Sequence, residues 1–159
     1  MKRIATTALM AAGLAFSAHA VLADGHGAAL EKAIKARQSL MQVYSFNLSG
    51  LGAMAKGEAK YDAKLAASLA GSLSNAAQAS IGAMWPQGSD STAMPGKTRA
   101  LVKAWTTYPE VQTKHEALLR AAANLVMVAG KGVEGLQAAV GEVGKSCGGC
   151  HKPFREPKK

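Results

Sequence analysis

The segment Cys147-Gly148-Gly149-Cys150-His151 contains the only two cysteines of a 159-residue chain, and eight residues follow it. Two thiols three positions apart, with a histidine directly after the second, are typical of a c-type haem attachment site. In such a site each thiol bonds to a haem vinyl group, and the histidine offers the iron its proximal imidazole nitrogen. The two glycines leave room for the porphyrin close to the chain. The motif therefore predicts one covalent haem c, attached at Cys147 and Cys150, with His151 as an iron ligand.

Two other kinds of site share part of this pattern. A thioredoxin-type redox pair is expected within a βαβ unit, whereas a helical pattern precedes Cys147. That thiol–disulfide reading would also require both thiols to be free. A structural zinc site needs four ligands, and after Cys147, Cys150 and His151 only His26 or His115, both distant in sequence, could supply the fourth. We therefore favour haem.

The N-terminal stretch over residues 1–23 has the features of a secretory signal peptide. Lys2 and Arg3 precede an apolar run over residues 4–16, and small-residue patterns follow at 18–20 and 21–23. The run is too short for a transmembrane segment, and nothing later in the chain resembles one. Cleavage after Ala23, or alternatively after Ala20, leaves one domain over residues 24–159. An export signal together with a c-type haem motif predicts a periplasmic protein.

Charge sets limits on the partners of this domain. Loss of Lys2 and Arg3 lowers the formal charge from +9 to +7, because residues 1–23 hold no acidic residue. The excess is either an ordinary solvated surface or a surface that attracts an acidic redox partner or another anionic surface. Nucleic acid is not expected in the periplasm, and the basic residues are spread along the chain, so we predict no nucleic-acid partner.

The rest of the chain predicts helices. Aromatic residues make up 5% of the chain, and no alternating β-branched run suggests a strand. Apolar residues at spacings of three and four predict helices over 28–55, 63–84 and 109–129, a short piece over 99–105, and a last helix that carries the haem motif. Asp62 is the expected N-cap of the second helix, and Pro109 lies in the first turn of the third. Residues 130–132 form a tight turn, and 85–98 is the long irregular connection.

These elements predict an all-α fold, an antiparallel four-helix bundle with covalently attached haem c near the C-terminus. The expected inward-facing stripes come from each of the four main helices. They include Leu30, Ile34, Arg37, Met41, Tyr44 and Leu48; Leu65, Leu69 and Leu73; Val111, Leu118, Leu125 and Val126; and Leu136, Val140, Val143, Cys147, Cys150 and Phe154.

Together these features resemble the class II cytochromes c, that is, cytochrome c′ and its low-spin relatives. The resemblance covers about residues 28–155 and rests on Arg37-Gln38-Ser39-Leu40-Met41, on the segments 56–62 and 85–90, and on the C-terminal haem motif between Val143-Gly144 and Phe154-Arg155. The C-terminal motif is the most specific point, because commoner small cytochromes c carry theirs near the N-terminus. The resemblance implies an antiparallel four-helix bundle, in a family whose members are often homodimers through the first two helices.

Position by position, the resemblance also implies roles for residues outside the motif. Arg155, one turn beyond His151, would lie beside the imidazole and polarise it. Arg37 would lie near a haem propionate, and Met41 would lie over the distal face. Trp85, or its neighbour Met84, would belong to the distal pocket.

Two features depart from the commonest family pattern. Pro153 lacks a helix N–H and predicts an end or kink two residues after the iron ligand. The 85–98 loop is more like that of the low-spin relatives.

The sixth iron position separates two functions. If Met41 ligates the iron, the haem is six-coordinate, and an axial methionine raises its reduction potential, which suits one-electron transfer between periplasmic redox proteins. If Met41 only packs against the ring, an open apolar distal site would bind nitric oxide or carbon monoxide. From the sequence we predict the electron carrier and keep gas binding as the alternative. We predict no enzyme, because nothing resembles a hydrolytic triad, a paired-carboxylate site or a phosphate loop.

Overall fold

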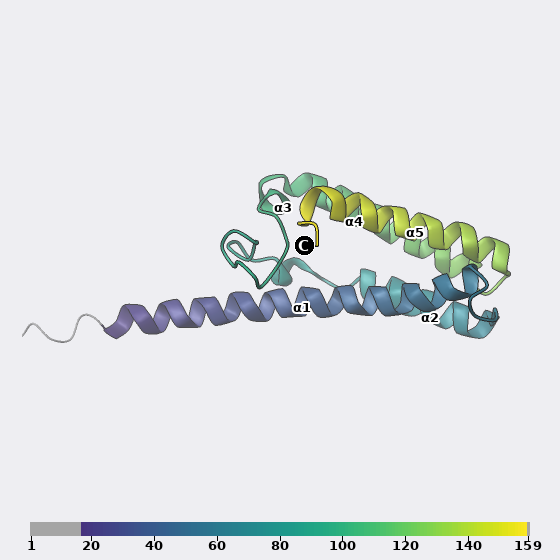
Figure 1. The fold of residues 1–159 in the computed structure, drawn as a ribbon, viewed down its shortest axis with the longest axis horizontal. Helices are drawn as coiled ribbons and strands as arrows, with labels where there is room; N and C mark the ends of the chain where they lie inside the picture. Colours follow the sequence, from purple (N-terminus) through teal and green to yellow (C-terminus); the bar gives the residue numbers. More distant parts are fainter. Residues whose placement is uncertain (1–16, 159) are drawn as a thin grey trace, which may run out of the picture.

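The computed structural model describes residues 17–158, which fold into helices and connecting loops (Figure 1). The elements are α1 (Ser17–Ala55), α2 (Ala63–Ala77), the short 3-10 helix η1 (Gly82–Met84), α3 (Lys103–Thr106), α4 (Tyr108–Val128) and α5 (Val133–Phe154). Residues 1–16 of the expected signal peptide lie outside the described residues. Its residues 17–23 belong to α1, which therefore begins before the expected residue 28 in this uncleaved chain.

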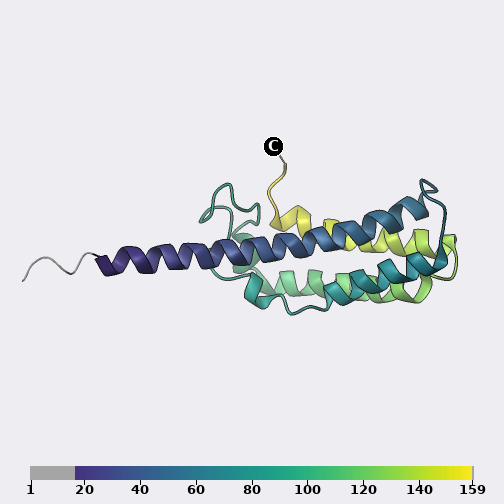
Figure 2. The same cartoon turned by 90° about the horizontal axis from the view of Figure 1, so that it is seen from below.

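The four long helices form two antiparallel hairpins (Figures 1 and 2). One hairpin consists of α1 and α2 and the other of α4 and α5, and the two are packed through α1 with α5 and α2 with α4. The loop that follows η1 and the short α3 lie at the same end as the C-terminus of α5. The predicted all-α four-helix bundle is confirmed, and within residues 17–158 the only β-type pairing is an isolated bridge between Ala100 and Arg155.

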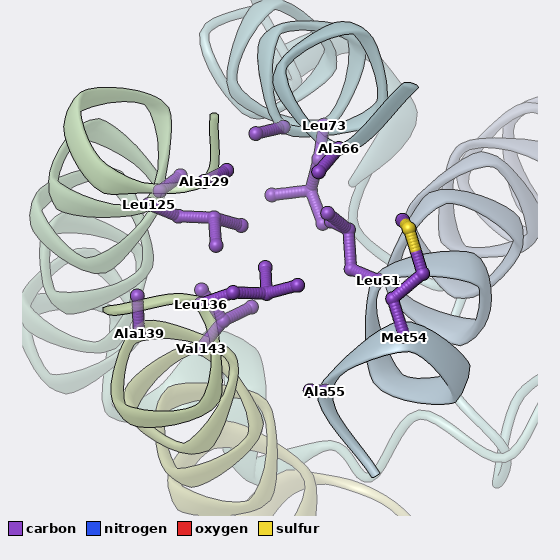
Figure 3. Packing of buried hydrophobic residues seen from close by; sticks show 12 residues of the cluster. Leu51, Met54, Ala55, Ala66, Leu73, Leu125, Ala129, Leu136, Ala139 and Val143 are labelled. Carbon is purple, nitrogen blue, oxygen red and sulfur yellow. The ribbon is translucent and has the colours of Figure 1, made fainter. Parts of the chain in front are cut away.

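The core fills the centre of the bundle, where leucine and valine side chains from all four long helices point toward one another (Figure 3). Leu51, Leu125, Leu136 and Val143 are each 0% exposed. Alanines such as Ala66, Ala70, Ala122 and Ala139 allow the helices to approach closely around these larger side chains. Cys147 is packed against the same cluster, so the core fixes the position of the haem motif.

Polar contacts close the end of the bundle opposite the haem motif. The Asp62 carboxylate accepts the N–H of Leu65 at 2.9 Å, which confirms the predicted N-cap of α2. The Tyr61 hydroxyl donates to the carbonyl of Ala129 at 2.9 Å and accepts the N–H of Gly132 at 3.0 Å. Gly132 has a φ of 147°, a backbone conformation that favours glycine. The two hairpin turns are thereby tied together.

Three expectations about the helices need correction. The second helix ends at Ala77 rather than at Met84, because Ser80 and Gly82 are weak helix formers and Pro86 disfavours helical backbone before it. The short helix expected over 99–105 is α3, which begins only at Lys103. The predicted end at Pro153 agrees with α5, which stops one residue later at Phe154, because proline has no N–H to donate and its ring crowds the carbonyl four residues earlier.

The third correction concerns burial. Leu65 and Val126, expected in the core, are 50% and 44% exposed, because each lies at the margin of its helix's buried face. None of the helices described in residues 17–158 is apolar over a stretch long enough for a membrane crossing.

Candidate functional site

A cavity of about 440 Å³ lies between α1, α4 and α5, and Cys147, Cys150 and His151 all line it. The motif occupies the last turns of α5, and the two cysteines, three positions apart, lie on one face of that helix. Most of the remaining wall is apolar. It includes Leu40, Met41, Tyr44 and Leu48 of α1, Val111 and Leu118 of α4, and Ile81, Trp85, Ala104 and Phe154.

The two cysteines are unpaired thiols, each partly buried. Burial raises the pKa of both Cys147 and Cys150, and for Cys150 the neighbouring Cys147 raises it further. A thiol–disulfide oxidoreductase depends on a cysteine of lowered pKa, and the βαβ surroundings of that class are replaced here by helix. In residues 17–158 no three His, Cys, Asp or Glu side chains gather as they would around a protein-bound metal ion, which disfavours the zinc alternative.

His151 is suited to bind iron. Burial is the main cause that lowers the pKa of its imidazole, and the positive charges of Arg155 and Arg99 lower it further. The ring is therefore neutral near pH 7, with a nitrogen lone pair available for a metal. A Cβ built on Gly148 or Gly149 would meet no protein atom within 4 Å, so packing within the protein does not account for these glycines. The apolar walls, the two free thiols on one helix face and the neutral imidazole fit haem c.

Arg37 is 4% exposed and is surrounded by uncharged oxygen atoms. Its Nη1 donates to the carbonyl of Met84 at 3.2 Å and to the hydroxyl of Ser89 at 2.7 Å. Its Nη2 donates to the Ser89 carbonyl and to the Thr98 hydroxyl, the latter at 3.0 Å. Burial lowers the pKa of Arg37, and the nearby Asp90 carboxylate opposes that shift. Only the Nε–H is left for another acceptor, so a contact with a haem propionate would have to use that atom.

The structure brings most of the predicted site residues together. Met41, Trp85, Arg37 and Arg155 all line the cavity that contains the motif. Met84, the alternative to Trp85, instead contributes its backbone carbonyl to Arg37. The roles that the family resemblance implies for these residues stay predictions.

Several important residues were missed by sequence reasoning. Ser89, Thr98 and Trp105 surround Arg37, and Arg99 and Lys114 line the cavity. The Ser-Asp pair at 89–90 was a usable turn signal, because the Asp90 carboxylate accepts the N–H groups of residues 92 and 93. Nothing in the sequence pattern indicates that residues 98–114 lie close to the haem motif.

The cavity wall carries positive charge. Arg37, Arg99, Lys114, Arg155 and Lys158 line it, and no aspartate or glutamate is present among the lining residues described. A low-dielectric wall strengthens the field of these cations inside the cavity. The site therefore favours a group with negatively charged substituents, such as haem propionates.

Comparisons with known proteins agree with this geometry. The sequence profile of the family described as Cytochrome C′ matches residues 32–155. A cytochrome c′ of Cereibacter sphaeroides is 34% identical over 155 residues, which cover 98% of each protein. The solved structure of a cytochrome c′ from Rhodobacter spheriodes is similar with a TM-score of 0.79 and 32% identity, over 81% of this chain and 98% of that one. A nitric oxide complex of a mutant cytochrome c prime from Alcaligenes xylosoxidans is similar with a TM-score of 0.70 and 27% identity, over 81% and 97% of the two chains.

Proposed function

We propose a haem-based function for this chain, which belongs to the cytochrome c′ family. The cofactor of that family is a covalent c-type haem with iron, and the chain has two cysteines for its attachment. In the proposal, Cys147 and Cys150 form the two thioether bonds and His151 ligates the iron. When bound, the haem supplies an iron that takes up a gas ligand or changes its charge by one electron.

The leading proposal is the binding of a small uncharged gas, nitric oxide or carbon monoxide. The observation that carries it is the apolar part that α1 contributes to the cavity wall, Leu40, Met41 and Leu48 with the ring of Tyr44, beside the polar Arg37, Gln42 and Ser45. The Tyr44 hydroxyl donates to the carbonyl of Ala76 at 3.2 Å. An apolar surface favours uncharged ligands over ions, which would lose hydration there without compensation. The similarity to a cytochrome c prime solved with nitric oxide supports the same reading.

Residues around His151 contribute by holding the proximal side. The pKa of His151 is lowered by burial and by Arg155, which keeps the imidazole neutral and able to ligate. Phe154, 4% exposed, fixes the last turn of α5 in the protein interior. The proposal includes no catalytic step on an organic substrate.

One-electron transfer is the second candidate, and the place of Met41 on the cavity wall supports it. In this version the Met41 sulfur would be the sixth ligand of the iron, and an axial methionine would raise the reduction potential of the haem. The sequence alone favoured electron transfer over gas binding. Family membership moves the gas-binding version ahead, because it is closer to the cytochrome c′ pattern.

Absorption spectroscopy with and without carbon monoxide separates the two versions. Gas binding predicts a high-spin spectrum that shifts when carbon monoxide is added to the ferrous protein. Ligation by Met41 predicts a low-spin spectrum with a methionine–iron charge-transfer band that the gas leaves unchanged, and the Met41→Leu variant should then become gas-sensitive. Met127→Leu is the matched control, since Met127 is 66% exposed on α4, away from the cavity. His151→Ala should keep the haem attached and alter the spectrum; an unaltered spectrum would remove His151 from the proposal.

Location and assembly complete the proposal. A periplasmic protein follows from the expected signal peptide and from the need of c-type cytochromes for haem attachment after export.

A homodimer through α1 and α2 is supported by Phe46 and Val43 of α1, which are 73% and 45% exposed. Size-exclusion chromatography should show a dimer that Phe46→Ser weakens; a monomer at all concentrations would remove this part of the proposal.

A further inference from the structure

Four cations that form no ion pair with an acidic residue of the described chain line the haem cavity, and we call them the cationic ring. The ring consists of Arg99, Lys114, Arg155 and Lys158, and the ion pairs found in residues 17–158 involve none of the four. Even if each haem propionate paired with one of these cations, half of them would stay free. The side chains of Arg155 and Lys158 are exposed to solvent. The charge is therefore available to another molecule.

A second depression extends this positive surface along the bundle. A groove between α4 and α5 shares Lys114 and Ser146 with the haem cavity, and it passes Gly149 of the haem motif. Gly149 has no side chain, so nothing from that position separates the groove from the attachment site. The other two cations of the groove are paired, Lys145 with Glu142 at 2.7 Å and Arg120 with Glu116 at 3.8 Å, which leaves Lys114 as its one cation without an ion pair.

The opposite end of the bundle has a different charge pattern. There Lys56 is paired with Glu58 at 3.5 Å, Asp62 caps α2, and Lys131 lies in the turn before α5. Acidic and basic side chains are mixed at that end. α5 rises about 1.5 Å per residue, so the turn before it lies roughly 20 Å from Cys147. At the end that holds the haem, by contrast, the four cavity-lining cations have no acidic partner among the ion pairs of residues 17–158.

We propose that the cationic ring of Arg99, Lys114, Arg155 and Lys158 is the docking surface for an acidic electron-transfer protein. Carboxylates on the partner would meet these cations and place its redox centre next to the haem edge. The transferred electron leaves the partner and reduces ferric iron to ferrous, and no bond forms or breaks. The inference rests on the proposed haem but holds for either sixth ligand, because carbon monoxide binds ferrous iron and a gas-binding haem also needs a reductant.

Electron exchange with small charged reagents tests the surface directly. Ferrous holoprotein is mixed in a stopped-flow instrument with hexacyanoferrate(III), an anion, or with tris-phenanthroline cobalt(III), a cation, each of which accepts one electron. Lys114→Glu and Lys158→Glu should each lower the rate constant with the anion about three- to tenfold at low ionic strength and raise it with the cation. High salt should remove both effects. Reduction potentials of all variants are measured so that differences in driving force are corrected.

Lys131→Glu is the matched control, because it makes the same charge change at the far end and should alter neither rate. Poly-L-glutamate, used as an acidic polypeptide, should slow the reaction of the wild type with the anion and affect Lys114→Glu less. Equal rates for Lys114→Glu, Lys158→Glu and Lys131→Glu would overturn the inference. A second outcome would also overturn it: Lys114→Glu no longer binds phosphatidylglycerol vesicles but exchanges electrons at the wild-type rate. That outcome would make the cationic ring a membrane-binding surface. In either case an intact haem spectrum would leave the proposed function standing.

Discussion

The guanidinium carbon of Arg37 lies 4.8 Å from the centroid of the Trp85 ring system. The same carbon lies 5.7 Å from the centroid of Trp105, whose indole N–H donates to the carbonyl of Trp85 at 3.1 Å. The two indole rings are 5.5 Å apart. Trp85 also lines the haem cavity. One buried cation from α1 therefore holds a cavity wall that belongs to the 85–105 segment.

Replacing Arg37 should loosen that wall. Arg37→Ala leaves the Ser89 and Thr98 hydroxyls and two carbonyls without their donor, which should lower the free energy of unfolding by about 2–4 kcal/mol. Arg120→Ala is the control, because that arginine is 69% exposed and makes a single surface ion pair worth at most about 1 kcal/mol. Urea unfolding of the holoproteins measures both. Equal losses in the two variants would show that the buried contacts of Arg37 do not hold the wall.

Leu136 tests the central core. Its side chain is 0% exposed at the start of α5, and its truncation in Leu136→Ala should lower the free energy of unfolding by about 3 kcal/mol through lost burial and a new cavity. Met127→Ala, on the exposed face of α4, should cost no more than about 0.5 kcal/mol. Thermal unfolding of both variants provides the comparison. A small loss at Leu136 would mean that the neighbouring side chains collapse into the space.

Local signals account for what the sequence could predict. The Asp62 cap and the spacing of apolar residues in α1 and α5 each lie within one segment, and the structure confirms both. The haem motif also lies within one segment, and the roles of its residues stay predictions. The partners of Arg37 could not be read in this way, because Ser89 and Thr98 lie 52 and 61 positions away and belong to an irregular loop. The family resemblance implies a haem propionate near this buried charge, and that role stays a prediction. In the structure, hydroxyl and carbonyl oxygens surround the guanidinium, with the Asp90 carboxylate nearby.

Asp62 offers a test of the first turn. Its carboxylate accepts the N–H of Leu65 at 2.9 Å, so Asp62→Ala should lower the free energy of unfolding by about 1 kcal/mol. Asp62→Asn is the matched control, because an asparagine oxygen can accept the same hydrogen bond and should cost only a few tenths of that amount. Chemical unfolding at one protein concentration distinguishes the two. If both variants lost the same stability, the charge of Asp62 rather than its hydrogen bond would be responsible.

The buried phenol of Tyr44 should make the free energy of unfolding depend on pH in the alkaline range. Its ring is 8% exposed, and burial is the main cause that raises the pKa of its phenol, with a smaller effect from Cys147. The folded protein therefore keeps this proton after the unfolded chain, with a pKa of about 10, has lost it. The contribution of the Tyr44 phenol to the free energy of unfolding is fully present below about pH 10. It is lost as the pH rises through the higher pKa that the phenol has in the folded protein.

The Tyr44→Phe variant isolates this effect, because phenylalanine does not titrate. Near neutral pH the variant should be less stable by about 0.5–1.5 kcal/mol, since the hydrogen bond of 3.2 Å to the Ala76 carbonyl is lost. Above about pH 10 the wild type should lose stability faster than the variant, so the difference should shrink and then change sign. Unfolding free energies measured at several values between about pH 8 and about pH 11 test the prediction. A difference that stayed constant over this range would mean that the Tyr44 phenol ionises as easily in the folded protein as in the unfolded chain.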